Sequence, residues 1–137
     1  MKVIYSYLTF NGNCREAMTF YKKCLGGELS FQTIGESPLS ETMPVKMKKC
    51  ILQAVLRNGD LVLIGTDMVS EQGLLKGSAV SLLLACSTEK EIRECYERLS
   101  QDGEQTHPLK NTFSNALFGM VTDKYGNTWI LNYDNKK

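Results

Sequence analysis

Few residues in this sequence have the types and the spacing that metal binding or catalysis requires. The chain has a single histidine, His107, and five cysteines: Cys14, Cys24, Cys50, Cys86 and Cys95. No two cysteines form a Cys-x-x-Cys pair, so the ligand spacing of a zinc site is absent. Each cysteine lies on or beside an apolar periodic position, which predicts buried free thiols in a reducing cytoplasm. A nucleophilic thiol would need His107 as its base.

The acidic residues also have structural explanations. General acid–base catalysis needs a titratable group inside a cavity. We interpret Glu16 and Glu91 as helix-capping acids, and Asp67 and Asp134 as strand-end turn residues. Asp123 belongs to a predicted hairpin turn. No Ser–His–Asp arrangement is found, and no Gly-rich phosphate loop precedes a helix at the required spacing. The sequence therefore favours binding over catalysis.

The bulk composition is that of an ordinary globular protein. The chain has 137 residues, 42% of them hydrophobic and 23% charged, with a net charge of +1. This length predicts one domain, 1–137. No apolar run approaches the roughly 20 residues of a membrane span, and the first ten residues lack a signal-peptide cleavage motif. The nearest basic cluster, Lys46 to Lys49, fits a solvated strand entrance. We expect a cytoplasmic protein with neither nucleic acid nor membrane as partner.

The first half of the sequence predicts a strand, a helix and three further strands. Alternation over residues 3–10 predicts the first strand. Asn13 followed by Glu16 is typical of a helix N-cap with a returning acid, and Gly26-Gly27 is typical of a helix end. The remaining expected elements are a strand at 28–34, a surface loop at 35–46 and a hairpin at 50–67.

The second half repeats this order. An apolar run at 79–86 predicts a strand, and Thr88 with Glu91 offers a second capping box. The apolar stripe of the following helix consists of Ile92, Cys95, Tyr96 and Leu99. A short strand or edge is expected at 105–109, where Pro108 suits an edge, and a hairpin at 116–134.

The two halves align as an internal duplication. Residues from Tyr7-Leu8 to Gly27 match those from Leu83-Leu84 to Gly103 at an offset of 76, and 59–67 match 126–134 at an offset of 67. We therefore predict an α+β fold of two tandem βαβββ modules forming a half-open barrel, with a pocket between the repeats. The predicted limits are 1–67 for module one, 68–78 for the linker and 79–134 for module two.

Two segments carry a resemblance to a known superfamily. The stretches "YLTFNGNCREAMTFYKKCLGGEL" and "FGMVTDKYGNTWILNY" resemble the vicinal oxygen chelate superfamily, which includes glyoxalase I, bleomycin resistance proteins and extradiol dioxygenases. Within it they are most similar to the PhnB-like branch. The resemblance implies paired βαβββ modules, usually in a homodimer and sometimes with modules exchanged between chains.

The resemblance also implies where a metal would be held. Enzymes of the superfamily usually bind a divalent ion with His and Glu from the first and last strands of each module. The aligned positions here are Ser6 and Ser81 in the first strands and Leu63 and Ile130 in the last strands, with Gln53 in a third strand. Neutral hydroxyls and hydrocarbons do not offset the dehydration of a divalent ion. We expect no metal and no cofactor.

Strand alternation predicts the residues that line the concave face. Unless paired inside the protein, a buried Gln53 amide would require a ligand as its partner. Filling of the barrel by core side chains, or packing between modules or subunits, is the alternative role of these positions. The predicted ligand-pocket residues are Ser6, Leu8, Gln53, Leu63, Ser81, Phe113, Phe118 and Ile130. Trp129 has the opposite parity from Ile130 and is expected to pack against a helix.

Three functions remain open at this point. The first is binding of a small molecule in the cavity between the modules, because the scaffold is duplicated while the usual metal ligands are missing. The second is a glyoxalase-type lyase, isomerase or dioxygenase, with or without a metal. The third is a ligand-free scaffold or interaction protein. Phosphonate metabolism and ubiquinone methyl transfer, which the branch's names imply, are not carried over, because no cationic cluster or nucleotide-type loop is present.

Overall fold

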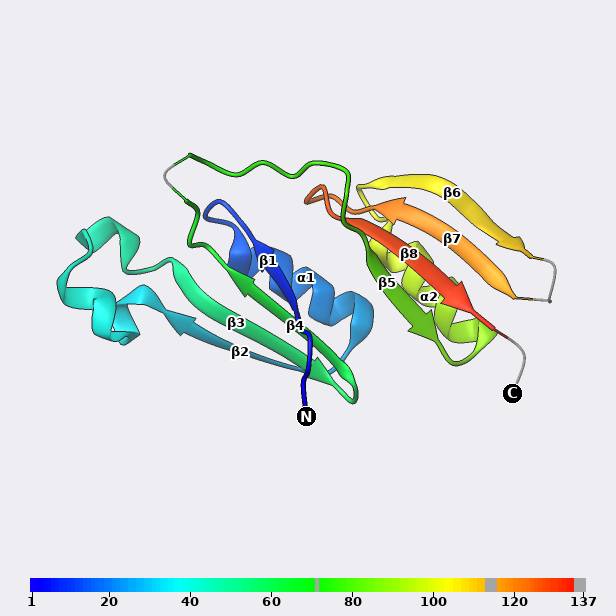
Figure 1. Ribbon diagram of the computed structural model, residues 1–137, viewed down its shortest axis with the longest axis horizontal. Coiled ribbons are helices and arrows are strands. Elements are labelled where there is room, and N and C mark those ends of the chain that lie inside the picture. Colours follow the sequence, from blue (N-terminus) through cyan, green and yellow to red (C-terminus); the bar gives the residue numbers. More distant parts are fainter. Residues whose placement is uncertain (71, 113–115, 135–137) are drawn as a thin grey trace. The chain divides into compact units, whose positions relative to one another are not determined.

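The chain folds into two compact units. The computed structural model describes residues 1–70, 72–112 and 116–134. Unit 1 spans Met1–Leu75 and unit 2 spans Lys76–Lys137. Each unit contains a strand, a helix and three further strands (Figure 1). The α+β class and the predicted strand–helix–strand–strand–strand order of each half are confirmed.

Unit 1 is a four-stranded mixed sheet with one long helix. The strand order is β1-β4-β3-β2, with β1 parallel to β4 and the other neighbours antiparallel. Parallel pairing of first and last strands requires the intervening helix as a crossover. The elements are β1 Ser6–Thr9, α1 Cys14–Leu25, β2 Glu28–Thr33, β3 Ile51–Asn58 and β4 Leu61–Thr66.

The expected surface loop between β2 and β3 contains three short 3-10 helices. They are η1 Ile34–Glu36, η2 Pro38–Glu41 and η3 Val45–Met47. The segment is anchored because Ile34 and Ser37 are buried. Ser37 Oγ donates a hydrogen bond to the Ile34 carbonyl at 2.7 Å, and the Thr33 N–H donates to Glu36 Oε1 at 3.0 Å. The proline and serine residues of this segment indicated a loop, but they did not predict the three short 3-10 helices.

Unit 2 has the same topology, but the turn before its last strand is longer. Its strand order is β5-β8-β7-β6, with β5 parallel to β8. The edge strand β6 is longer than the short strand expected at 105–109, and Pro108 lies within it, as an edge position allows. The elements are β5 Leu82–Cys86, α2 Glu89–Leu99, β6 Glu104–Asn111, β7 Leu117–Thr122 and β8 Thr128–Tyr133.

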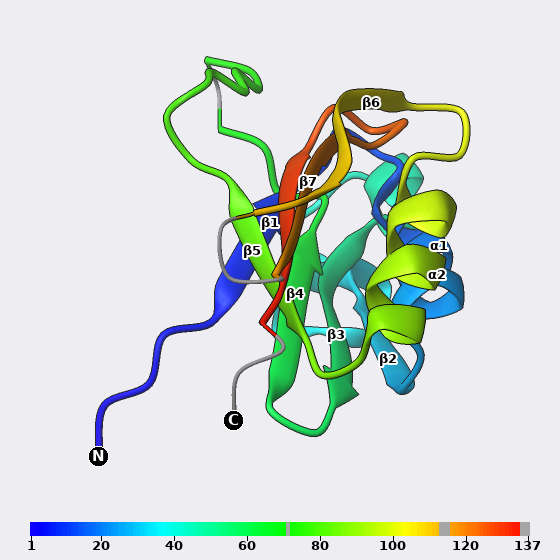
Figure 2. The ribbon, with the colours of Figure 1, turned by 90° about the vertical axis from the view of Figure 1, so that its right-hand side faces the viewer.

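The core of unit 1 lies between α1 and one face of its sheet (Figure 2). Ala54 and Leu56 of β3 are fully buried. The helix approaches β4 most closely at Gly65, where an added Cβ would lie 2.9 Å from Met18 Sδ and 3.1 Å from Cys14 Sγ. The glycine thus allows the helix to lie directly on the sheet.

The core of unit 2 is built in the same way, with α2 packed on one face of its sheet. The predicted apolar stripe of this helix is buried. An added Cβ at Gly119 of β7 would lie 2.8 Å from the Tyr96 ring. The Tyr96 hydroxyl donates to the His107 carbonyl at 2.7 Å, which ties the helix to the edge strand β6.

The two long helices begin with different caps. The predicted Thr88 cap at α2 is present, because the Glu91 N–H donates to Thr88 Oγ1 at 3.0 Å, whereas Glu91 Oε1 accepts from the N–H of Ser87, one residue before the cap, at 2.8 Å. The side-chain cap expected from Asn13 is wrong, because Asn13 makes no such bond. The Cys14 N–H instead donates to Asp67 Oδ1 at 2.9 Å, so a residue distant in sequence caps α1.

The first strand of each unit is shorter than the strand that the sequence pattern predicted. β1 begins at Ser6 rather than at residue 3, and β5 begins at Leu82 rather than at residue 79. Val3 and Ile4 are exposed and pair with no strand. An alternating pattern therefore does not by itself show that a segment is part of a sheet. Among the helices that the structure describes, none has the length and apolar character to cross a membrane.

Candidate functional site

The strand registers assign each side chain to one face of its sheet. Gly65 points toward α1, and residues paired across strands share a face. Leu8 pairs with Gly65, and Ser6 pairs with Leu63. These three predicted pocket residues, Ser6, Leu8 and Leu63, therefore face the helix and belong to the core side of unit 1. Their assignment to the concave face was wrong.

For Leu63, the error has a physical cause in the turns that precede the last strands, whereas Ser6 was matched to Ser81 at an offset of 75 (81 − 6) instead of 76. In unit 1 the hairpin closes at the pair Asn58–Leu61, whereas in unit 2 it closes at Thr122–Thr128. Matching the turn glycines gave an offset of 67, but the strand registers pair Tyr7 with Ile64 and Leu83 with Ile130, an offset of 66 (130 − 64). A slip of one residue moves a side chain to the other face.

The helix-free face of unit 1 mixes polar and apolar groups. Tyr7, Ile64 and Val55 lie side by side across β1, β4 and β3, and the Tyr7 side chain is 60% exposed. Gln53 pairs with Gln32 on the same face. Because Gln53 is exposed, the expected need for a buried partner to its amide does not arise.

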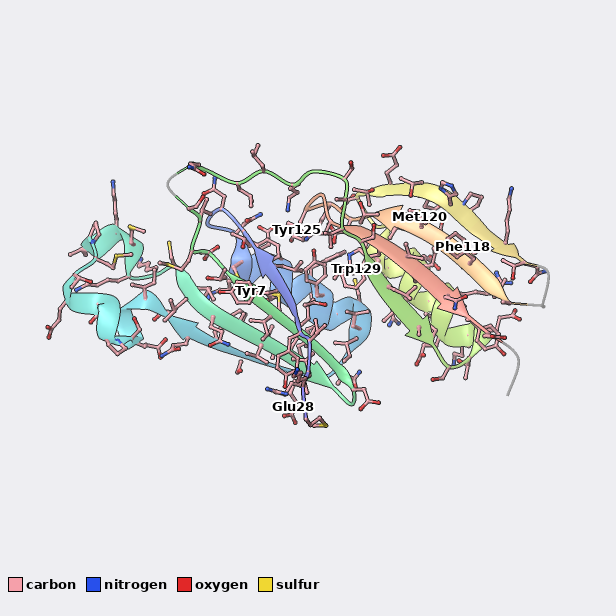
Figure 3. The ribbon with its side chains drawn as sticks, viewed as in Figure 1. Tyr7, Glu28, Phe118, Met120, Tyr125 and Trp129 are labelled. Carbon is pink, nitrogen blue, oxygen red and sulfur yellow. The ribbon has the colours of Figure 1, made fainter. Side chains whose placement is uncertain are left out.

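The helix-free face of unit 2 is more apolar. Leu83, Ile130 and Met120 form one row across β5, β8 and β7, and Asn132 and Phe118 lie in the next row. Figure 3 shows Phe118 and Met120 along β7. Phe118 and Ile130 lie on the face that strand alternation predicted. Their role in a ligand pocket stays a prediction.

Two predicted pocket residues lie outside these strands. Ser81 precedes β5 and is exposed. Phe113 lies outside the described residues. Trp129 shares a face with Gly119 and Leu131, so it lies on the helix side of β8, as its parity predicted. The predicted cavity between the modules also stays a prediction, and each face is described only for its own unit.

Asp67 organises the end of unit 1, a role that sequence patterns did not reveal. Its Oδ1 accepts hydrogen bonds from the N–H groups of Gly12 at 3.0 Å and Cys14 at 2.9 Å, and its Oδ2 accepts from Ile51 at 2.9 Å. The carboxylate therefore joins the ends of β4 and β3 to the start of α1. An Asp directly after a strand was the available signal, but its partners are distant in sequence.

Asp123 organises the β7–β8 turn of unit 2 and is only 3% exposed. Its Oδ1 accepts from the N–H groups of Tyr125 at 2.9 Å and Asn127 at 3.1 Å, and its Oδ2 accepts from Trp129 Nε1 at 2.8 Å. These bonds occupy both carboxylate oxygens. Asp123 thus holds the turn and the indole in place, which agrees with its predicted turn role.

The cysteines are free thiols with contrasting environments. Four are buried, whereas Cys50 is half-buried rather than buried as expected. Burial, with a smaller contribution from Asp67, raises the pKa of Cys14 from 9.0 to about 12. A hydrogen bond from Cys86 lowers the pKa of Cys95, and the same bond together with burial raises the pKa of Cys86. Cys14 is therefore protonated at neutral pH and is a poor nucleophile.

The residues at the metal positions implied by the superfamily do not fit a metal. The positions that the resemblance assigns, Ser6, Ser81, Leu63 and Ile130, offer two hydroxyls and two hydrocarbons. The helix-free pairs of first and last strands are Tyr7 with Ile64, Thr9 with Thr66, Leu83 with Ile130 and Ala85 with Asn132. None of these residues supplies an imidazole, a thiolate or a carboxylate to replace the hydration of a divalent ion. Within residues 1–70, 72–112 and 116–134, no three His, Cys, Asp or Glu side chains are grouped so that they could hold a metal.

The architecture defines the class of protein. Two βαβββ units, each a mixed sheet with one helix on one face, constitute the glyoxalase/bleomycin resistance protein/dioxygenase fold. A glyoxalase/bleomycin resistance protein/dioxygenase from Alicyclobacillus acidocaldarius has the same fold, with a TM-score of 0.60 and 15% identity over 98% of this chain and 92% of that one. At this identity the likeness concerns the fold alone.

The chain belongs to the PhnB-like family described as 3-demethylubiquinone-9 3-methyltransferase, which matches residues 2–132. It is similar to protein PA1353 from Pseudomonas aeruginosa, with 34% identity, a TM-score of 0.84 and 98% of each chain covered. A structure from Bacillus cereus, a putative 3-demethylubiquinone-9 3-methyltransferase called PhnB protein, has 28% identity and a TM-score of 0.73, with 96% of this chain and 99% of that one covered. Protein YjdN of Escherichia coli K12 is 29% identical over 92% of this chain and 91% of its own length.

Proposed function

We propose that this protein binds a small molecule on the helix-free face of unit 2 without metal chemistry. The observation that carries the proposal is the apolar row formed by Leu83, Ile130 and Met120, which lies across three neighbouring strands with Leu83 66% exposed. A solvent-exposed apolar row on a sheet face is unfavourable unless something covers it. A ligand with an apolar body satisfies this requirement.

The chemistry of the face selects the ligand class. The paired positions of β5, β7 and β8 on this face bear no ionisable side chain. At the β6 edge, Glu104 pairs with Thr122, His107 with Met120 and Lys110 with Phe118, so ionisable groups border this face only along that edge. Phe118 and Met120 offer an aromatic ring and a polarizable thioether, which favour a flat or aromatic ligand. The Asn132 amide supplies both a donor and an acceptor. The preferred ligand is therefore uncharged, partly aromatic and able to form one or two hydrogen bonds.

The proposal does not include the methyl transfer that the family description names, nor the metal-dependent reactions of the wider fold. The positions that the resemblance assigns to a metal, Ser6, Ser81, Leu63 and Ile130, provide no imidazole or carboxylate, and neither do Tyr7, Ile64 and Leu83 on the helix-free faces. We place the protein in a reducing cytoplasm, since its five cysteines are free. We also propose a homodimer as its assembly.

The test uses an uncharged aromatic dye, N-phenyl-1-naphthylamine, titrated into the full chain. Energy transfer from the single tryptophan, Trp129, reports binding because its neighbour Ile130 lies on the proposed face. We expect Ile130→Glu to weaken dye binding at least about tenfold, since the added carboxylate must be desolvated beside the ligand. Met120→Thr, which adds no charge, should weaken it several-fold.

Val80→Glu is the matched control, because Val80 is 83% exposed and precedes β5. This variant should bind the dye like the unmodified protein. The anionic dye 1-anilinonaphthalene-8-sulfonate should bind more weakly than the neutral one. Equal binding by Ile130→Glu and Val80→Glu would refute the site, and preference for the anionic dye would refute the ligand class. A stoichiometric metal in the purified protein would refute the absence of metal chemistry.

A further inference from the structure

Unit 2 contains two cysteines on neighbouring elements. Cys86 is the last residue of β5, and Cys95 lies nine residues later (95 − 86) on the buried side of α2. Cys86 has the parity of Leu84, which pairs with Leu131 on the helix side of the sheet. The two thiols are hydrogen-bonded to each other. The end of the strand and the helix that packs on it thus bring two thiols into contact (Figure 1).

The two thiols of this pair are less deeply buried than the cysteines of α1. Cys86 and Cys95 are each 9% exposed, whereas Cys14 is 0% and Cys24 is 3% exposed. Cys50 of unit 1 is half-buried and therefore more accessible than either member of the pair. A comparison with Cys50 separates the effect of exposure from the effect of a neighbouring thiol.

The hydrogen bond gives the two sulfurs different roles. The Cys86 S–H donates to the Cys95 sulfur, which lowers the pKa of Cys95, and Arg98 acts in the same direction. Burial and the carboxylates of Glu91 and Glu94 oppose this effect. The same bond, together with burial, raises the pKa of Cys86. Because the thiolate is the nucleophilic form, Cys95 is the reactive sulfur and Cys86 is its hydrogen-bond donor.

We propose that Cys95 and Cys86 react with a hydroperoxide and are converted to a disulfide. In the first step the Cys95 thiolate attacks one oxygen of hydrogen peroxide and the O–O bond breaks. Cys95 becomes a sulfenic acid, and the departing hydroxide takes up the proton that Cys95 had released. In the second step the Cys86 sulfur attacks the Cys95 sulfur and the S–O bond breaks. The second hydroxide takes the Cys86 proton, so two thiols are oxidised while one peroxide is reduced to two waters.

The pair suits a disulfide better than a metal ion. Among the residues that the structure describes, no three His, Cys, Asp or Glu side chains are grouped to hold a metal, whereas a disulfide needs only two sulfurs. Thiols in hydrogen-bond contact need only a small side-chain rotation to reach an S–S length of about 2.05 Å. The disulfide would join β5 to α2 on the helix side of the sheet. The proposed ligand face is the opposite one, so this reaction does not depend on the proposed function.

The first experiment treats the full chain with hydrogen peroxide, blocks the remaining thiols with an alkylating reagent and maps the tryptic peptides by mass spectrometry. Trypsin separates positions 86 and 95, because Lys90 and Arg93 lie between them. We expect the two peptides to be joined, lighter by the two hydrogens that the reaction removes, and to be separated again by dithiothreitol. Oxidation of Cys50 while the pair stays reduced, or a link from either member to another cysteine, would overturn the proposal.

Cys50→Ser is the matched control for this mapping, because it removes the more exposed thiol and leaves the pair intact. The joined peptides should form at an unchanged rate in this variant. A marked loss of the joined peptides would mean that Cys50 is the sulfur that meets the peroxide.

The second experiment tests the two roles separately. In Cys86→Ser the hydroxyl can still donate to the Cys95 sulfur, so a sulfenic acid should form at Cys95 and be labelled by dimedone. In Cys95→Ser, oxidation of Cys86 should be at least about tenfold slower than oxidation of Cys95 in Cys86→Ser, since burial keeps Cys86 protonated. Faster oxidation of Cys86 than of Cys95 would overturn the assigned roles.

The third experiment changes the charge beside the pair and leaves both cysteines in place. Glu91→Gln removes a negative charge that disfavours the Cys95 thiolate, while its amide oxygen can still accept from the Ser87 N–H. We expect disulfide formation to be several-fold faster in this variant. Glu89→Gln is the charge-matched control: Glu89 pairs with Arg93 on the helix surface, and the rate should not change. Equal rates in the two variants would exclude attack by the Cys95 thiolate.

Discussion

Unit 1 and unit 2 have the same strand order and the same parallel pairing of first and last strands. The sequence separation between equivalent residues of the two units nevertheless differs between the first strands and the last strands. Equivalent first-strand positions differ by 76 residues (83 − 7) and equivalent last-strand positions by 66 (130 − 64). The difference shows that the closing pairs of a hairpin, and not its glycine, determine which residues of the outgoing strand face the helix.

The units also stabilise their turns with one carboxylate each, placed at different points. Asp67 follows the last strand of unit 1 and binds three N–H groups in two distant backbone segments. Asp123 follows the third strand of unit 2 and binds groups only two to six residues away. Asp67 therefore holds together segments that are distant in the sequence, and Asp123 stabilises a local turn. Substitutions can separate these two roles.

The largest effect is expected from removing the two carboxylates. Asp123→Ala should destabilise the protein by about 3 kcal/mol, because the buried indole N–H and two backbone N–H groups lose their acceptor. Asp67→Ala should cost about 2 kcal/mol, since its surroundings are more exposed and water can replace part of the bonding. Urea unfolding followed by circular dichroism gives both values, and Trp129 fluorescence follows unit 2.

Asp123→Asn, which keeps one acceptor in the same shape, is the control and should lose less stability than Asp123→Ala. If Asp67→Ala proved as damaging as Asp123→Ala, burial would not be what distinguishes the two aspartates.

A smaller effect is expected where each helix meets its sheet. Gly119→Ala should cost about 2 kcal/mol, because the new methyl group would lie 2.8 Å from the Tyr96 ring, which cannot move without losing its bond to the His107 carbonyl. Gly65→Ala should cost about 1 kcal/mol, since it meets the flexible Met18 thioether. Chemical denaturation of both variants tests the order, and a greater loss for Gly65→Ala would contradict it.

The smallest effect separates the two helix caps. Thr88→Ala should cost about 1 kcal/mol, because its hydroxyl accepts from the Glu91 N–H. Asn13→Ala should cost only a few tenths of a kcal/mol, as Asn13 makes no side-chain cap and Asp67 takes that role. Thermal unfolding of the pair measures the difference. Equal losses would mean that Asn13 contributes to capping in solution.

Much of the fold follows from sequence patterns that act over short distances. Apolar periodicity located both helices, Thr88 and Glu91 identified one cap, and alternation placed Phe118 and Ile130 on the helix-free face. These features depend on residues close to one another in the chain. The first-strand offset of 76 was correct because no insertion separates those strands from their helices.

The patterns failed where partners are distant in sequence. The face of Leu63 depends on where the β3–β4 hairpin closes, and one residue reverses it. Ser6 was matched to Ser81 at an offset of 75 (81 − 6), one residue short of the 76 by which the first strands correspond. The capping role of Asp67 depends on a backbone N–H that is 53 residues away. The part of the predicted pocket that lies on β1 and β4 was therefore assigned to the wrong face of unit 1, although the residue types were read correctly.

The parallel pairing of first and last strands has a consequence for biosynthesis. Ser6 of β1 can pair only after Leu63 of β4 has been synthesised, 57 residues later (63 − 6). Leu82 of β5 can pair only after Trp129 has been synthesised, 47 residues later (129 − 82). Pairing at such separation is slow compared with helix formation. On the ribosome, the uncharged β1 segment therefore remains exposed until β4 has emerged, a period in which a chaperone would protect nascent chains from premature association.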